Sequence, residues 1–486
     1  MKIKDYIKEY YPNMEVFNNH EIINVTDNSK KVIKDSIFVA IEGYTSSGYD
    51  YIEEAINKGA KTIIVSNNLK NLFRYTNKLL NKVNFIGVDN PRVDLARLLK
   101  IAFINKNRTF PIMISVTGTA GKTTTSSIIY QVLKSMDYDV LLIGSNGYYS
   151  YYGLNEVYEE TKNTTPSIST IYELIGKNKM NYDYVVIEVS SQGVVEGRVL
   201  GIDFDYSIIT NFYKEHLEYH LNLSEYRNAK ARILNQTKKA IVINKDISGF
   251  NFFNNQNVVK KITYGLDNSD FKFVTLDDDS IFLIQNYDKT YIIEKRLEGD
   301  FNILNIIGAF ALLLEIGLNE VKLIDSINKL EPVIGRMNLI YDKNKKIYVD
   351  YAHTIIGVEK VLKYFNKIKK NKIISVIGCG GDRDKNRRPI IGKIVTTYSD
   401  LVIFTEDNSR NETTKNIIND IVSGVETDNY FIEQDRSKAI KLACDISKEN
   451  DIVLILGKGN EKTIEINKKY NDFNDIEVVK KIMEGK

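Results

Sequence analysis

Cysteine, tryptophan and proline are scarce in this chain, whose 486 residues include two Cys, no Trp and six Pro. The two cysteines, Cys379 and Cys444, lie far apart and in no paired spacing. This argues against a disulfide framework or a zinc site and favours a reducing, cytoplasmic setting.

Strong net charge and long apolar runs are also missing. The formal net charge is +3, with basic and acidic residues interleaved, so nothing indicates a nucleic acid or a membrane surface as a partner. No stretch approaches the roughly 18 apolar residues of a membrane-spanning helix, and the first residues contain no apolar signal-peptide core. We expect a cytoplasmic protein without nucleic acid or membrane partners, and we take it to be a monomer.

The chain is too long for one hydrophobic core and predicts about three domains. Apolar strands alternate with helical segments, and the strands of the last third end in polar or glycine-rich turns: KKIYVDYA, KIISVIGCG, DLVIFTED and DIVLILGKG. Parallel, doubly wound sheets show this alternation and bind ligands at the carboxyl ends of their strands. We predict an α/β fold of three domains, 1–107, 108–333 and 334–486, with a central P-loop-type doubly wound sheet, flanking α/β domains and a Rossmann-like last domain. Residues 270–298 are expected to form a β-hairpin.

A glycine-containing turn, TGTAGKTTT, follows the apolar strand PIMISV and opens a helical segment. The strict phosphate-loop pattern fails, because Val116 stands where that pattern needs glycine. The context nevertheless fits a phosphate site, since Gly118 and Gly121 allow close backbone approach and Lys122 can reach the β- and γ-phosphates. Thr123 could place its hydroxyl on Mg²⁺. The alternative is an ordinary strand–turn–helix corner with a surface lysine.

Two further polar groups follow apolar strands of the same region. Glu188 ends the strand in VVIEVSSQG, and His216 lies in TNFYKEHLEYH, just after the strand FDYSIIT. A lone buried acid or histidine is usually a structural group, but here both fall at strand ends beside a phosphate loop. A carboxylate and an imidazole beside bound triphosphate suggest a magnesium site.

These segments resemble the Mur ligases, ATP-dependent amide-forming enzymes of peptidoglycan synthesis, and most of all the MurE type, which adds the third peptide residue. The phosphate loop of that family is T-G-T-x-G-K-T-T, which TGTAGKTT matches, so Val116 is no defect. Further matching segments follow in order: NTTPS, EVSSQG, TNFYKEHLEYH, GDFNILN, GRMN, DYAHT, GCGGDRD, EDNSRNE and GKGNE.

The resemblance implies a set of ligand-binding residues. The ATP-binding positions are Gly118, Thr119, Ala120, Gly121, Lys122, Thr123, Thr124, Asn305, Arg336, Asp350 and His353. The implied catalytic residues are Lys122, Glu188, His216 and Lys230. Two magnesium ions are implied, one at Thr123 and one at Glu188, His216 and Lys230, the last as a carbamate formed with CO₂. From spacing alone, Lys230 could equally be a surface lysine of a helix.

The implied substrate positions fall in all three domains. A UDP-MurNAc-dipeptide would be held by Ser29, Asn163, Thr164, Thr165, Ser190 and Arg198. The substrate positions of the third domain are Arg383, Asp407, Asn408, Arg410, Gly457 and Glu461, and they hold the free amino acid. Arg410 suits a bidentate clamp on the distal carboxylate of meso-diaminopimelate, which L-lysine lacks. The alternative is that Arg410 pairs with nearby Glu406 or Glu412.

The expected function is therefore ATP-dependent joining of an amino acid, with meso-diaminopimelate the best candidate, to the D-Glu of UDP-MurNAc-L-Ala-D-Glu through an acyl phosphate. Several substrate-reading segments depart from the family pattern, at Lys30, Gln192, Ser409 and Asn460. Two alternatives stay open: a ligase that uses L-lysine or another amine, and a non-catalytic protein that binds a nucleotide sugar. The related folate polyglutamylation ligases share the loop but match DNSR and GKGNE poorly.

Overall fold

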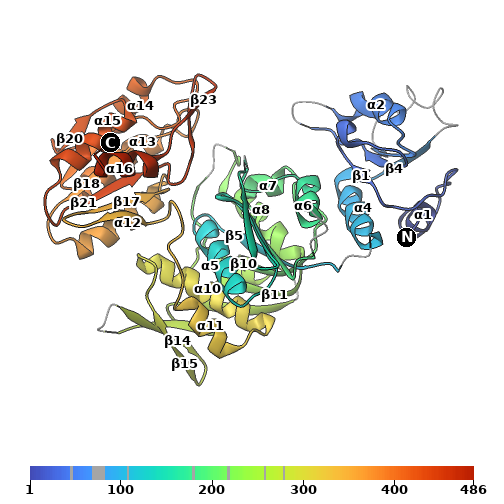
Figure 1. The fold of residues 1–486 in the computed structure, drawn as a ribbon, viewed down its shortest axis with the longest axis horizontal. Coiled ribbons are helices and arrows are strands. Elements are labelled where there is room, and N and C mark those ends of the chain that lie inside the picture. The colour runs from blue at the N-terminus through green and yellow to red at the C-terminus, as the bar shows by residue number, and fades with distance from the viewer. Residues whose placement is uncertain are drawn as a thin grey trace.

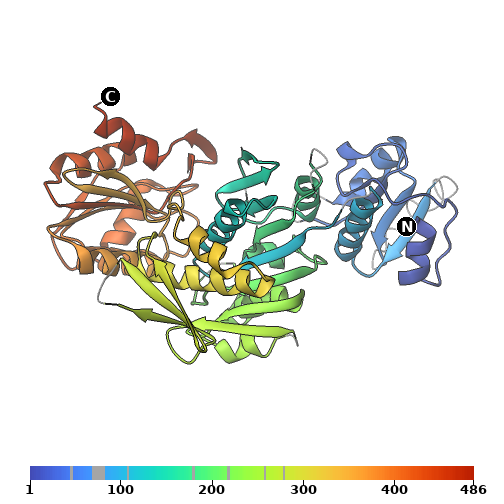
Figure 2. The ribbon, with the colours of Figure 1, turned by 60° about the horizontal axis from the view of Figure 1, so that its bottom comes forward.

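The structure is a computed structural model of the whole chain. It describes residues 1–43, 47–67, 83–106, 109–161, 163–177, 181–215, 219–256, 259–276 and 280–485. Three bodies follow one another along the long axis, with the N-terminal body at one end and the C-terminal body at the other (Figures 1 and 2). None of the described helices is long and apolar enough to cross a membrane.

The N-terminal body is built on a parallel sheet of four strands in the order β1-β2-β3-β4. Its strands are β1 (Val25–Thr26), β2 (Ile37–Val39), β3 (Thr62–Ser66) and β4 (Asn84–Val88). Its helices are α1 (Ile3–Tyr10), η1 (Ser29–Lys31), η2 (Gly48–Tyr51), α2 (Ile52–Asn57) and α4 (Pro91–Asn105). Asn90 caps α4 and Pro91 begins it, a helix start that the Asn-Pro pair favours.

The central body is built on an eleven-stranded sheet in the order β15-β14-β13-β12-β11-β10-β5-β9-β6-β7-β8. The strands from β13 to β6 in that order run parallel, and the strands outside them are antiparallel additions. The strands are β5 (Ile112–Thr117), β6 (Val140–Gly144), β7 (Gly147–Tyr152), β8 (Asn155–Glu159), β9 (Tyr184–Glu188), β10 (Phe204–Ile209), β11 (Thr237–Asn244), β12 (Lys260–Gly265), β13 (Phe271–Thr275), β14 (Ile281–Asn286) and β15 (Lys289–Glu294). The hairpin expected at residues 270–298 is therefore a three-stranded extension of this sheet.

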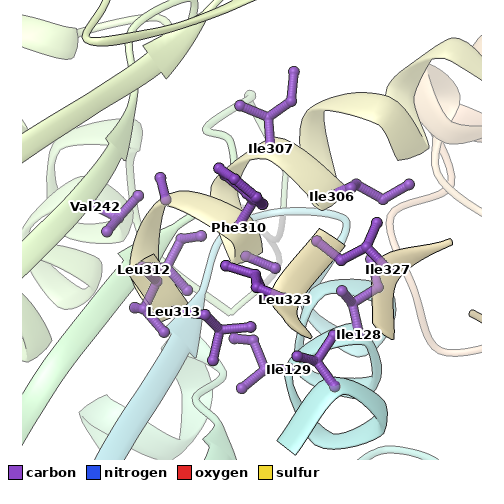
Figure 3. Packing of buried hydrophobic residues seen from close by; sticks show 14 of the residues in the cluster. Ile128, Ile129, Val242, Ile306, Ile307, Phe310, Leu312, Leu313, Leu323 and Ile327 are labelled. Atoms are coloured by element: carbon purple, nitrogen blue, oxygen red, sulfur yellow. The ribbon is translucent and has the colours of Figure 1, made fainter. Parts of the chain in front are cut away.

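The helices of the central body cover both faces of its sheet. They are α5 (Lys122–Ser135), α6 (Ile168–Ile175), α7 (Ser191–Val195), α8 (Leu223–Asn235), α9 (Phe250–Asn254), α10 (Asp300–Ile316) and α11 (Glu320–Ile327). Side chains of α5, α10 and α11, among them Ile129, Phe310 and Leu323, pack together in one large apolar cluster (Figure 3). Because α10 is apolar on all sides, it is buried almost throughout, which fixes its amino end against the phosphate turn.

The C-terminal body has a six-stranded sheet in the order β16-β17-β21-β18-β19-β20, parallel except for β16, and a separate two-stranded β22-β23 hairpin. Its strands are β16 (Asn338–Asp342), β17 (Lys346–Asp350), β18 (Ile373–Ile377), β19 (Leu401–Phe404), β20 (Tyr430–Ile432), β21 (Ile452–Leu456), β22 (Thr463–Ile466) and β23 (Lys469–Asp472). Its helices are α12 (Ile355–Ile368), α13 (Arg387–Tyr398), α14 (Thr414–Val422), α15 (Arg436–Ile446) and α16 (Asp475–Met483).

The three-domain α/β fold predicted from the sequence is confirmed, and the domain boundaries after residues 107 and 333 stay predictions. In both larger sheets, neighbouring parallel strands end at one edge. β5 ends between β9 and β10, and β21 ends between β17 and β18. These edges carry the glycine-rich and polar turns, as expected for ligand sites in open parallel sheets.

Candidate active site

The glycine-containing turn after β5 is shaped by two glycines. Gly118 and Gly121 have φ of 151° and 79°, values that L side chains rarely adopt. A Cβ at Gly118 would lie 2.0 Å from Thr210 Oγ1, and one at Gly121 would lie 2.6 Å from Asn305 Oδ1. Glycine is therefore required at both positions, and the turn presents the backbone N–H groups of the amino end of α5, where helices bind phosphate.

The residues that follow β10 hold this turn in place. Thr210 Oγ1 donates to the carbonyl of Ala120 at 2.6 Å. Asn211 accepts from the Ala120 N–H at 2.7 Å and donates to the Ala120 carbonyl at 2.8 Å. The hydrogen bonds of Thr210 and Asn211 thus fix the conformation of the phosphate turn in the protein without ligand.

Two lysines meet at one carbonyl oxygen of this turn. Lys122 Nζ donates to the Gly118 carbonyl at 2.9 Å, and Lys230 Nζ, from α8, donates to the same oxygen at 2.7 Å. Lys230 is almost fully buried, and burial together with the charge of Lys122 lowers the pKa of Lys230 well below its usual range. Burial also lowers the pKa of Lys122 to about 8, against the opposing pull of Glu188. Lys230 is therefore a buried amine that favours its neutral form.

Glu188, at the end of β9, lies beside the same turn and is buried. Its carboxylate accepts from Thr123 Oγ1 at 3.0 Å and from Ser126 Oγ at 3.3 Å. Ser145, which follows β6, donates to it through both its backbone N–H and its hydroxyl, each at 3.1 Å. A Cβ at Gly144 would lie 2.1 Å from Glu188 Oε1, so that glycine makes room for the carboxylate.

The predicted metal ligands are brought together in part. Thr123 and Glu188 are in hydrogen-bonding contact, and Lys230 shares the Gly118 carbonyl with Lys122. His216 lies outside the described residues. Among the residues that the structure describes, no cluster of three His, Cys, Asp or Glu side chains is placed to hold a metal ion.

The start of the C-terminal body reaches the phosphate turn through Arg336. Its Nη2 donates to Thr123 Oγ1 at 3.0 Å, and its guanidinium lies 4.1 Å from the centre of the Tyr351 ring. Asp350, at the end of β17, accepts from the N–H groups of Met337 and Ala352, both at 2.7 Å. Burial raises the pKa of Asp350, while Arg336 opposes that shift.

The other two predicted nucleotide residues lie in α10 and just after β17. Asn305, in α10, donates to Asn302 at 3.0 Å, and its side chain lies beside Gly121, where a Cβ would be 2.6 Å from its Oδ1. His353 Nδ1 donates to the Tyr351 carbonyl at 2.9 Å, and the two rings lie edge to face.

A cavity of about 560 Å³ lies between the central and C-terminal bodies. It is lined by all the predicted ATP positions, namely Gly118, Thr119, Ala120, Gly121, Lys122, Thr123, Thr124, Asn305, Arg336, Asp350 and His353. Lys230 and the predicted substrate positions Asn163, Thr164, Ser190, Arg198 and Arg383 also line it. One cavity therefore joins the phosphate turn to groups from both bodies.

The predicted substrate residues of the central body form a small hydrogen-bonded group. Thr165 Oγ1 donates to the carbonyl of Glu188 at 2.9 Å and accepts from the Ser190 N–H at 2.9 Å. Arg198 donates to the Thr165 carbonyl at 2.8 Å, and Thr164 shares a hydrogen bond with the Ser145 hydroxyl. Ser29 does not join this group, because it lies in the N-terminal body, where its hydroxyl donates to Glu54 at 2.8 Å.

Several residues of the C-terminal body that were predicted to bind the free amino acid surround the buried Lys458. Its Nζ donates to Glu461 at 2.7 Å and to Asn408 Oδ1 at 3.2 Å, and lies 3.9 Å from Asp407. Although burial opposes it, the positive charges of Lys458 and Arg436 hold the pKa of Asp407 below its usual range. The left-handed Gly457, with φ of 114°, leaves space for the Asp407 carboxylate.

Arg410 lies next to this group, but its partner differs from both residues proposed from the sequence. Glu412 pairs with Arg388 instead, and the acid beside Arg410 is Glu465, whose Oε2 lies 3.2 Å from Arg410 Nε. Neither Glu406 nor Glu412 pairs with Arg410 in the part of the chain that the structure describes. The alternative that Arg410 pairs with an acid is therefore confirmed, but the acid is Glu465 and not Glu406 or Glu412.

Sequence reasoning overlooked several residues that build the site. Thr210 and Asn211 fix the phosphate turn, Ser145 fixes Glu188, and Lys458 links Asn408 to Glu461. Each directly follows an apolar strand or its glycine, and a systematic look at the carboxyl end of every strand could have found them.

Comparisons with known proteins agree with this geometry. Three family descriptions match the chain in order: the Mur ligase family, catalytic domain, at residues 21–106, the Mur ligase middle domain at 116–313, and the Mur ligase, glutamate ligase domain, at 335–459.

Similar proteins cover almost the whole chain. A UDP-N-acetylmuramoyl-L-alanyl-D-glutamate--2,6-diaminopimelate ligase 1 of Clostridium acetobutylicum is 35% identical over 95% of this chain and 94% of its own length. The enzyme of the same name, without the numeral, from Aquifex aeolicus is 36% identical over 95% of this chain and 93% of its own. A solved structure of such a ligase superposes with a TM-score of 0.70 at 28% identity, covering 99% of this chain and 98% of that one. The chain therefore belongs to the Mur ligase family.

Proposed function

We propose that this protein is a MurE-type ligase that joins meso-diaminopimelate to the D-Glu of UDP-MurNAc-L-Ala-D-Glu at the expense of ATP, in peptidoglycan precursor synthesis. The observation that carries the proposal is that the chain has two sites, the phosphate turn of the central body and the group around Lys458 in the C-terminal body. The phosphate turn and its two lysines line one cavity together with Arg336 and Asp350 of the C-terminal body. The cluster of Asn408, Arg410 and Glu461 belongs to that same body. The names of the similar ligases support this choice of substrates.

The reaction has two steps. An oxygen of the D-Glu γ-carboxylate attacks the γ-phosphorus of ATP, and ADP leaves. The amine of the amino acid then attacks the resulting acyl phosphate at its carbonyl carbon, loses a proton, and expels phosphate. No protein nucleophile takes part, so the residues contribute by positioning the substrates and neutralising charge.

The residues of the cavity suit these tasks. Lys122 and the N–H groups of the turn would neutralise and orient the phosphates, and Arg336 brings a second positive charge to Thr123. Closure of the C-terminal body over the cavity would exclude water, which would otherwise hydrolyse the acyl phosphate. Asn305, Asp350 and His353 would hold the adenosine part, since they line the same cavity.

Magnesium fits the donors that are present. Thr123 and Glu188 offer the oxygen ligands that Mg²⁺ prefers, and His216 and Lys230 complete the proposed set. Bound magnesium would supply charge neutralisation at the phosphates. A neutral buried amine reacts with CO₂ to give a carbamate, and the lowered pKa of Lys230 favours that form. The carbamate would add a carboxylate-like ligand where a lysine offers none.

The UDP-MurNAc-dipeptide would extend from the N-terminal body, at Ser29, to the group of Asn163, Thr164, Thr165, Ser190 and Arg198. Arg383, Asp407, Asn408, Arg410, Gly457 and Glu461 would hold the free amino acid. We infer further that the protein acts in the cytoplasm as a monomer, which sedimentation at micromolar concentration would check.

One observation favours a second candidate, the same ligase with L-lysine as the amino acid. Glu465 neutralises part of the charge of Arg410, which weakens the case for a carboxylate partner. Arg410 nevertheless keeps donors for a carboxylate, whereas L-lysine would leave a guanidinium that is about four-fifths shielded from water without that partner.

The test is ATP-dependent phosphate release with UDP-MurNAc-L-Ala-D-Glu and either meso-diaminopimelate or L-lysine. We expect turnover with meso-diaminopimelate, reduced roughly 10- to 150-fold in kcat/KM by Arg410→Ala, as for loss of one charge-assisted hydrogen bond. Turnover with L-lysine alone would support the second candidate. No phosphate release with either amine, in a protein that binds ATP, would contradict the ligase proposal.

A further inference from the structure

The loop that carries Arg410 has an unusual backbone. Arg410 has φ of 52°, in the left-handed region that residues with a Cβ disfavour, so surrounding contacts must hold it there. The residue before it is Ser409, so no proline ring restrains the loop at that position. Something other than proline therefore fixes the arginine.

The β22 segment supplies that support through its backbone. The Arg410 N–H donates to the Glu465 carbonyl at 3.0 Å, and the Asn467 N–H donates to the Arg410 carbonyl at 2.7 Å. The N–H of Glu465 donates to Asn408 Oδ1 at 2.9 Å. The hairpin thus pairs with the loop almost as an additional strand, with Arg410 opposite Ile466.

The side chain of Glu465 then fixes the guanidinium. Its carboxylate lies 3.2 Å from Arg410 Nε, while Arg410 Nη1 donates to the Gly381 carbonyl at 2.8 Å and to the Asn408 carbonyl at 3.4 Å. Nη2 donates no hydrogen bond to any residue that the structure describes. Both side chains are about one-fifth exposed, so the pair is largely shielded from water.

We propose that Glu465 is a positioning residue that sets the preference of this ligase for an amino acid with a second carboxylate at its far end. By holding Nε, it fixes the rotamer of Arg410 and leaves Nη2 as the donor for that carboxylate. This inference rests on the proposed function.

An alternative role for Glu465 predicts the opposite preference between the two amino acids. If its charge served to cancel that of Arg410, the site would accept an amino acid with a distal ammonium group, such as L-lysine. The two roles can be separated because Gln at position 465 keeps a polar oxygen in the place of the carboxylate beside Nε but carries no charge, whereas Ala removes both.

The experiment compares kcat and KM of the wild type, Glu465→Ala and Glu465→Gln for meso-diaminopimelate, L-lysine and ATP. The matched control is Glu426→Ala, which breaks an exposed ion pair with Lys393 in the same body. For Glu465→Ala we expect KM for meso-diaminopimelate to rise at least about tenfold, with kcat and KM for ATP within about threefold of wild type. Glu465→Gln should restore KM to within about threefold, and Glu426→Ala should match the wild type.

Three outcomes with an active wild type would overturn the inference. Glu465→Ala with unchanged preference between the two amino acids would show that Arg410 needs no such support. A rise in meso-diaminopimelate preference in Glu465→Gln, with loss of L-lysine turnover, would show that the charge is what matters. Equal losses in every kinetic constant, together with a lower melting temperature, would assign Glu465 a general structural role. If the wild type itself turns over no amino acid, the proposed function fails and the inference fails with it.

Discussion

Replacing Gly121 by alanine tests whether the phosphate turn is as tightly constrained as its geometry indicates. The new Cβ would lie 2.6 Å from Asn305 Oδ1, whereas ordinary contacts begin at 3.4 Å. Either the asparagine or the turn must therefore move by about 0.8 Å, the difference between these two distances. A displaced turn misplaces the N–H groups that would bind phosphate.

The magnitude follows from two separate effects. Alanine in the left-handed region costs about 1–2 kcal/mol, of which about 0.4–1 kcal/mol is offset by the stiffer unfolded chain. Losing one charge-assisted hydrogen bond to phosphate costs about 1.5–3 kcal/mol, or roughly 10- to 150-fold in the Kd for ATP. The first effect lowers stability only, and the second lowers ATP affinity.

Gly153 provides the matched control. It also has a positive φ, of 54°, but a Cβ there would meet nothing within 4 Å. Gly153→Ala should therefore lose only the stability that the left-handed backbone costs and keep wild-type ATP affinity. The readouts are calorimetric titration with ATP and thermal unfolding of both variants.

Two results would refute the reasoning. One is Gly121→Ala binding ATP within about twofold of wild type, and the other is Gly153→Ala losing as much affinity as Gly121→Ala. The double variant with Asn305→Ala gives a further check, because removing the obstructing side chain should make the combined loss smaller than the sum of the single losses.

The remaining predictions concern the two lysines of the turn. With ¹³C-bicarbonate, the wild type should show a carbamate carbonyl resonance that Lys230→Arg lacks and that Lys238→Arg, a change at an exposed lysine, retains. Bicarbonate-dependent activity should follow that signal, and full activity of Lys230→Arg in CO₂-free buffer would contradict the carbamate. Because the pKa of Lys122 is about 8 in the free protein, its ammonium form prevails below that pH, and the Kd for ATP should rise as pH increases through about 8. Lys122→Arg should flatten this profile, since arginine stays charged, and a pH-independent Kd in the wild type would show that Lys122 does not titrate near pH 8.

Local sequence patterns predicted the parts of the site that one strand and its following turn define. The run from PIMISV to the helix start placed Gly118, Lys122 and Thr123 together, because a strand, a glycine turn and a helix are contiguous in the chain. Glu188 was likewise placed at a strand end, and the structure puts it in contact with Thr123.

Contacts between segments that lie far apart in the sequence could not be predicted. The alternative for Arg410, besides the carboxylate clamp, was a pair with an acid two to four residues away, but the acid beside it is Glu465, because β22 lies beside the loop only in the folded chain. For the same reason, the support that Thr210 and Asn211 give to Ala120 could not be seen. Such contacts depend on the order of strands in a sheet. The apolar periodicity of a single segment does not predict that order.

Tyr351 has one neighbour that contacts the phosphate turn and one in the group around Lys458, so it can couple the binding of ATP to the binding of the amino acid. One side of its ring carries Arg336, which reaches Thr123, and the carboxylate of Glu461 adds to the effect of burial in raising the pKa of its hydroxyl. A ligand that moves either neighbour changes the environment of the other. Thermodynamic linkage then requires reciprocity: if the nucleotide tightens amino-acid binding by some factor, the amino acid must tighten nucleotide binding by the same factor. Paired titrations of one ligand in the presence and absence of the other would measure that factor, and a Tyr351→Leu variant should bring it close to one.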